Sequence, residues 1–99
     1  MKNTRVTREQ AKRLGKLFRI DFTVVPFDEW VTGLRIELEH GTTGPGNQLT
    51  NVTNDSQVDT ARIAVAHLIE DPRYYKYLKE METAREKYWN SRHKPTIFK

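Results

Sequence analysis

The strongest constraint on the fold is a set of four segments whose apolar residues recur at helical spacing. Each segment opens with a typical helix-start signal: a Thr7–Gln10 capping box, Pro26, a capping Asp55 or Ser56, and the pair Asp71–Pro72. These signals predict helices over about 7–18, 26–40, 56–70 and 72–91. Since residues 20–25 have no second strand-like run to pair with, we interpret them as an extended connector. The chain is therefore predicted to be all-α.

The length of 99 residues suits one small hydrophobic core. We expect a compact single domain in which residues 1–25 form a basic N-terminal helix and connector, 26–92 the core and 93–99 a tail. The third helix is expected to be central, because residues 61–69 are apolar almost all round. Four further apolar side chains are expected to turn towards the core: Phe22 and Val25 of the connector, and Ile97 and Phe98 of the tail.

The sequence makes specific predictions for Gly33, for Gly41 and for the tyrosines of the fourth helix. A glycine inside a helix costs roughly 1 kcal/mol relative to alanine, so Gly33 predicts that another backbone comes close. Gly41 is expected to end the second helix in the left-handed conformation. The apolar stripe of the fourth helix is predicted to bury Tyr74, Tyr77 and Tyr88, whereas Tyr75 points off that stripe.

The connection from Gly41 to Asp55 is long for so small a domain, and it is rich in glycine, threonine and asparagine. We expect its first half to be mobile. Residues 50–55 carry side chains that bond to the nearby backbone, so its second half is expected to be structured.

Several classes of protein are disfavoured by what the sequence lacks. Without cysteine there are no disulfides, thiolate metal sites or cysteine nucleophiles. No apolar run approaches the roughly 20 residues of a membrane span, and no secretory signal is recognisable, so an intracellular location, cytoplasmic by default, is expected. Serine-hydrolase and phosphate-loop patterns are also missing, and we do not expect an enzyme.

Two Glu/His pairs form the sharpest chemical feature of the sequence. Glu37 with His40, and His67 with Glu70, are each three residues apart, so each pair shares a helix face. If the second and third helices pack side by side, the four side chains are candidate ligands of a divalent ion such as zinc, iron or manganese. The alternative is a structural clasp in which a buried imidazole and a carboxylate satisfy each other without an ion. Because Glu and His are common on helices and no fixed signature such as a zincin motif is present, we favour the clasp.

The N-terminal segment is strongly basic and is a candidate surface for nucleic acid or a protein partner. Its positive side chains can attract phosphate or an acidic surface, although a solvated helix face is the simpler interpretation. The candidate residues are Arg5, Arg8, Lys12, Arg13, Lys16 and Arg19.

Three runs of sequence support a resemblance to a known family. They are ELEHG at 37–41, TNVTND at 50–55 and AVAHLIEDPRYY at 64–75. In their order they resemble a family of small uncharacterised domains found in bacteria and large DNA viruses, over residues 36–81. The resemblance implies that both Glu/His segments belong to one domain, and it implies no activity. Arg73 departs from the family's pattern, and residues 1–25 lie outside the resemblance.

These observations favour a non-enzymatic accessory or interaction protein that binds a protein partner or itself and has no membrane association. The loop 41–55 and the basic first helix are its expected contact surfaces. Two alternatives stay open: a small metal-binding domain that uses the paired Glu and His residues, and a nucleic-acid-associated protein of a large DNA virus, located in the virion or host cytoplasm.

Overall fold

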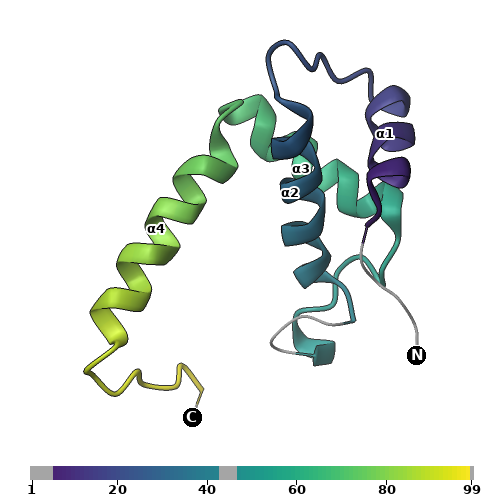
Figure 1. Cartoon of the computed structure of the whole chain (residues 1–99). Coiled ribbons are helices and arrows are strands. Elements are labelled where there is room, and N and C mark those ends of the chain that lie inside the picture. The colour runs from purple at the N-terminus through teal and green to yellow at the C-terminus, as the bar shows by residue number, and fades with distance from the viewer. Residues whose placement is uncertain (1–5, 43–46, 99) are drawn as a thin grey trace.

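The computed structural model describes residues 6–42 and 47–98, and this part of the chain forms four α-helices and no strand (Figure 1). The helices are α1 (Arg8–Leu17), α2 (Phe27–Glu37), α3 (Gln57–Glu70) and α4 (Tyr74–Trp89). Two short 3-10 helices, η1 (Leu38–His40) and η2 (Asn47–Leu49), lie between α2 and α3. The all-α prediction with four helices is confirmed. None of the described helices combines the length and apolar character needed to cross a membrane.

The helices α1 and α3 begin where their capping residues predicted, whereas α4 begins at Tyr74, two residues after the predicted start at Pro72 and without a side-chain cap. The Thr7 hydroxyl accepts a hydrogen bond from the Gln10 N–H at 3.1 Å, and the Gln10 side chain accepts one from the Thr7 N–H at 2.9 Å. Ser56 likewise accepts from the Asp59 N–H at the start of α3. These bonds satisfy N–H groups that have no partner within the helix, so local chemistry sets the starts.

The helix α3 packs against α1, α2 and α4, so the prediction that the third helix is central is confirmed. The helix α2 also packs against the other three, and its buried residues come from several of its sides: Trp30, Val31, Gly33, Leu34 and Glu37. In α3 the buried residues are Thr60, Ala61, Ala64 and Leu68, while Ala66 and Ile69 are exposed. The expectation that α3 is buried almost all round was therefore wrong. Its outer apolar residues remain at the surface because no other helix covers them.

Trp30 fixes α1 on α2. Its side chain is fully buried, and its indole N–H donates to the carbonyl of Ala11 at 2.8 Å. On the same side of the molecule, the Arg35 guanidinium donates to the carbonyl of Val6 at 3.0 Å. Both bonds join segments that are distant in sequence, and both satisfy polar groups away from bulk water.

The connector and the tail differ in how far they follow the predictions. Val25 is buried as predicted, whereas Phe22 stays partly exposed and packs edge-on against Phe27, with ring centroids 5.2 Å apart. The connector from α1 to α2 is not extended as predicted but forms turns, because the N–H groups of residues 24 and 25 both donate to the Asp21 carbonyl. In the tail Ile97 and Phe98 are 90% and 66% exposed, so the prediction that they fold back was wrong.

The loop after η1 is fastened at its base. The N–H groups of Val52 and Thr53 both donate to the His40 carbonyl, and the Asp55 carboxylate accepts from the Thr42 N–H and hydroxyl. The structured second half is thus confirmed. The expected mobility concerned the first half, whose residues 43–46 lie outside the described part of the chain.

Gly41 is buried in an extended conformation with φ −103°, so the left-handed helix end predicted there was wrong. A Cβ at this position would overlap the Asp55 carboxylate. The position therefore requires glycine for space and not for its φ angle.

Candidate functional site

The carboxylate of Glu37 is the centre of a buried polar cluster. Glu37 is the last residue of α2 and is 3% exposed. The Tyr75 hydroxyl of α4 donates to its Oε2 atom at 2.6 Å. The Nε2 atoms of His40 and His67 lie 3.3 Å from Oε1 and 3.6 Å from Oε2, respectively. Side chains from α2, η1, α3 and α4 therefore converge on one carboxylate.

The sequence builds this cluster in three local steps. The three-residue spacing places His40 beside Glu37, and the packing of α3 on α2 brings in His67. Gly33, one turn before Glu37, leaves a notch for the Tyr75 ring, since a Cβ there would lie 2.5 Å from the ring. The close approach predicted at Gly33 is thus made by a side chain, not by a backbone.

His67 is held by its aromatic neighbours as well as by Glu37. Its ring stacks on Tyr74 with centroids 4.1 Å apart and planes 8° from parallel, and Tyr75 meets it edge-on. Its Nδ1 atom is buried without a hydrogen-bond partner among the described residues. The stacking fixes the plane of the imidazole, so Nε2 faces the carboxylate.

The Tyr75 hydroxyl serves as a permanent donor in this cluster. Burial of the phenol, together with its hydrogen bond to Glu37, raises the pKa of Tyr75 far above its ordinary value of 10.0. The proton therefore stays on Tyr75 at neutral pH, and the Glu37 carboxylate receives a direct protein hydrogen bond.

The four predicted metal ligands are only partly brought together. Glu37, His40 and His67 meet, whereas Glu70 is exposed at the end of α3 and takes no part in the cluster. Although these three residues are close together, they are not arranged as a group that could hold a metal ion. No such group of three or more His, Cys, Asp or Glu residues occurs in residues 6–42 and 47–98. The divalent-ion site stays a prediction, and the observed contacts fit the clasp alternative with Tyr75 as an additional partner.

Tyr75 is the member of the cluster that the sequence pattern missed. Tyr75 is buried, while Tyr77 and Tyr88 on the predicted core stripe are about half exposed, so those assignments were wrong. The reason is that α4 rests on the core by the face that carries Tyr75. The sequence of α2 contained a usable signal. Gly33 leaves space for a ring one turn before Glu37, and the Glu37 carboxylate accepts a hydrogen bond, so together they fit the phenol of a tyrosine.

Four of the basic candidates belong to α1 and are exposed: Arg8, Lys12, Arg13 and Lys16. Arg8 forms an ion pair with Asp28 at 2.7 Å and stacks over Phe27. Arg19 is exposed as well and adopts a positive φ of 58°. Arg5 lies outside the described residues. These placements keep the side chains accessible, and nucleic-acid binding stays a prediction.

A second exposed feature runs along α4. Figure 1 shows this helix projecting away from the other three, and Tyr75 is its one buried residue. Tyr77, Met81 and Tyr88 are 45%, 53% and 53% exposed, and Ala84 between them is exposed as well. We call Tyr77, Met81, Ala84 and Tyr88 the α4 stripe. The Arg73 guanidinium lies over the Tyr77 ring, 5.1 Å from its centroid, and the Arg92 guanidinium lies over the Tyr88 ring at 4.1 Å, so these local contacts cover part of the stripe.

One protein-family model covers most of the chain. The model of the family described as "Protein of unknown function (DUF5661)" matches residues 11–84, from α1 into α4. The chain belongs to this family. The DUF5661 match reaches back to Ala11, which corrects the expectation that residues 1–25 lie outside the resemblance. No curated protein and no solved structure matches the chain.

The raised pKa of Tyr75 predicts a loss of stability at alkaline pH. The pKa of Tyr75 is higher in the folded chain than in the unfolded chain. The contribution of its protonated hydroxyl to the free energy of unfolding is therefore complete below about pH 10 and is lost as the pH rises further. Urea unfolding at increasing pH should show this loss in the wild type and a smaller one in Tyr75→Phe. Tyr77→Phe, at an exposed tyrosine of the same helix, should behave like the wild type. Equal alkaline losses in the wild type and Tyr75→Phe would contradict this role.

Proposed function

We propose that this protein is a non-enzymatic interaction protein that associates with a second copy of itself through the α4 stripe. The observation that carries the proposal is the apolar stripe left exposed on a projecting helix. An exposed apolar surface of this kind typically marks an interaction site. The contact surface that we propose is therefore α4 and not the loop 41–55 or α1.

The spacing of the stripe fits a paired helix. Tyr77, Met81, Ala84 and Tyr88 are separated by four, three and four positions, which is the heptad pattern of helices that pack side by side. Tyr74 extends the pattern by three positions towards the core, where it already stacks on His67. The heptad therefore begins at the core and continues along the exposed part of the helix.

An antiparallel pair supplies complementary neighbours. When the two-fold axis of the pair lies between Met81 and Ala84, Met81 of each copy faces Ala84 of the other, and Tyr77 of each copy faces Tyr88 of the other. A large side chain therefore meets a small one in the middle of the pair. Beside these layers, Glu80 of one copy lies next to Lys87 of the other, and opposite charges at such positions favour one orientation. The antiparallel helix dipoles also attract.

A parallel pair is the alternative arrangement. It would match Glu80 with Arg85 of the second copy, but it would set Met81 against Met81 and bring both α1–α3 cores to the same end. The antiparallel pair keeps the two bulky cores at opposite ends of the joined helices, and we therefore favour it.

The test is the mass of the protein in solution as a function of concentration. Sedimentation should show a rise from the single-chain mass of 11.7 kDa towards twice that value. Met81→Asp places a charge in the centre of the stripe and should abolish the rise. Thr83→Asp adds the same charge at an exposed position off the stripe and should preserve it. A wild type that stays monomeric, or a Met81→Asp protein that still dimerises, would overturn the proposal.

A further inference from the structure

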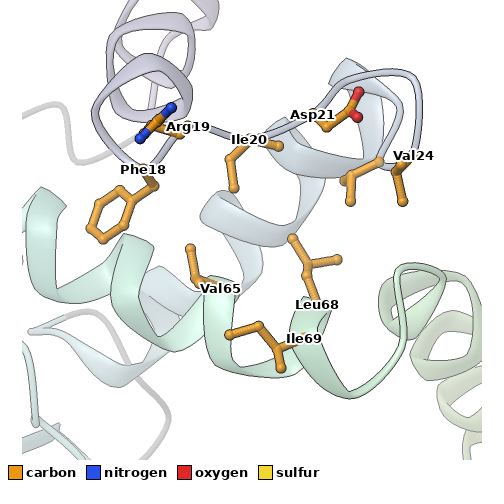
Figure 2. A pocket seen from close by; sticks show the side chains of 9 residues that line it. Phe18, Arg19, Ile20, Asp21, Val24, Val65, Leu68 and Ile69 are labelled. Carbon is orange, nitrogen blue, oxygen red and sulfur yellow. The ribbon is translucent and has the colours of Figure 1, made fainter.

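An open apolar groove lies between the α1–α2 connector and the C-terminal half of α3 (Figure 2). Its volume is about 360 Å³. Val24 and Ile69, on its two sides, are both exposed, and Leu68 forms part of its buried wall. The complete lining is Phe18, Arg19, Ile20, Asp21, Val24, Val25, Val65, Leu68 and Ile69. The groove therefore offers apolar walls with one acidic and one basic side chain.

The acidic side chain of the groove is set for an ionic contact. The hydroxyl and N–H of Thr23 donate to Asp21, and these bonds lower the pKa of its carboxyl group. Asp21 is consequently ionised at neutral pH. Arg19 also lines the groove, so the lining carries no net charge. An occupant with two apolar side chains would match the walls, with Asp21 as the partner for a cation that precedes them.

The C-terminal segment of the chain has this composition. Ile97 and Phe98 are its two large apolar side chains, and both are exposed. Arg92 and Lys94 precede them and supply the positive charge. In the described chain these apolar side chains have no core to join, since they follow the projecting end of α4 (Figure 1).

Within one chain, the groove and the tail lie at opposite ends of α4. Ile69 of the groove comes just before the start of α4 at Tyr74, whereas the tail follows its last residue, Trp89. A helix of 16 residues is about 24 Å long. The helix therefore holds the tail away from the groove of its own chain.

We propose that this groove receives the C-terminal segment, residues 90–98, of a second copy, with Ile97 and Phe98 seated against the groove walls. The inference rests on the self-association proposed above and adds a second contact to it. In the antiparallel pair, Trp89 of one copy lies beside Lys76 of the other, close to the start of α4. Nine further residues span up to about 30 Å when extended, which suffices to pass the 71–73 turn and reach Ile69.

Crosslinking between different chains tests this placement directly, because the natural chain has no cysteine. A Phe98→Cys chain is mixed with an Ile69→Cys chain, and disulfides between the two are quantified by mass spectrometry under mild oxidation. The matched control replaces Ile69→Cys by Val52→Cys, because Val52 is 76% exposed against 78% for Ile69 and does not line the groove. Docking raises the effective thiol concentration to the order of millimolar, so the groove pair should form at least about tenfold faster than the control.

The outcomes separate the two proposals. Preferential linkage of residues 98 and 69 between chains supports tail docking. A protein that dimerises by sedimentation but links residue 98 to residue 69 no faster than to residue 52 overturns tail docking and leaves α4 pairing intact. Preferential linkage of 98 to 98 in a Phe98→Cys sample indicates a parallel pair and also overturns it. A protein that stays monomeric overturns both.

Discussion

Replacing Tyr75 by alanine is expected to lower the free energy of unfolding by about 3–5 kcal/mol, the range typical of a deleted buried aromatic ring. The ring fills the notch over Gly33, and its hydroxyl provides the hydrogen bond to the buried Glu37 carboxylate. The substitution removes both, so a cavity and a less well satisfied carboxylate are left in the core.

Two further variants separate these contributions. Tyr75→Phe keeps the ring and removes the hydroxyl, so its loss should be about 1–3 kcal/mol. Tyr77→Ala truncates the half-exposed tyrosine two positions along the same helix and should cost about 1 kcal/mol or less. Urea unfolding followed by helical circular dichroism, at concentrations below self-association, measures all three. If Tyr75→Ala were no less stable than Tyr77→Ala, the cluster would not be part of the core.

Replacing Trp30 by alanine should cause a loss of similar size, about 3–5 kcal/mol. Trp30 is the largest fully buried side chain, and its indole N–H donates to the Ala11 carbonyl. Truncation opens a cavity between α1 and α2 and removes the bond that joins the two helices. The same unfolding measurement detects the loss.

The chain contains a matched control for this substitution. Trp89, the other tryptophan, is only partly buried and lies at the far end of α4. Trp89→Ala should therefore cost about 1 kcal/mol or less in the monomer. Similar losses in the two variants would argue against Trp30 as the anchor of α1.

Local signals in the sequence predicted the helices well because the groups that decide them are close in sequence. The Thr7–Gln10 capping box and the Ser56 cap satisfy N–H groups within one turn, so the helix starts follow from the residues themselves. The pairing of Glu37 with His40 rests on a three-residue spacing and was predictable for the same reason.

The choice of helix face was harder to predict, because it depends on which other elements are available to cover it. Tyr77 and Tyr88 share the more apolar stripe of α4, yet Tyr75 is buried because Gly33 and Glu37 provide a notch and an acceptor on another helix. Likewise Ile69 is exposed because no segment of the described chain covers the outer face of α3. Periodicity describes a helix surface and does not identify its neighbour.

The anchoring of α4 by a single buried residue near its start has a consequence for how the protein responds to its own concentration. The later turns of the helix lack tertiary support in one copy, and a short helix in water is only marginally stable by propensity alone. Pairing of two chains would give those turns the tertiary support that one copy lacks. The second half of α4 is therefore expected to resist local unfolding more strongly as the protein concentration rises, whereas the α1–α3 core is expected to keep its stability.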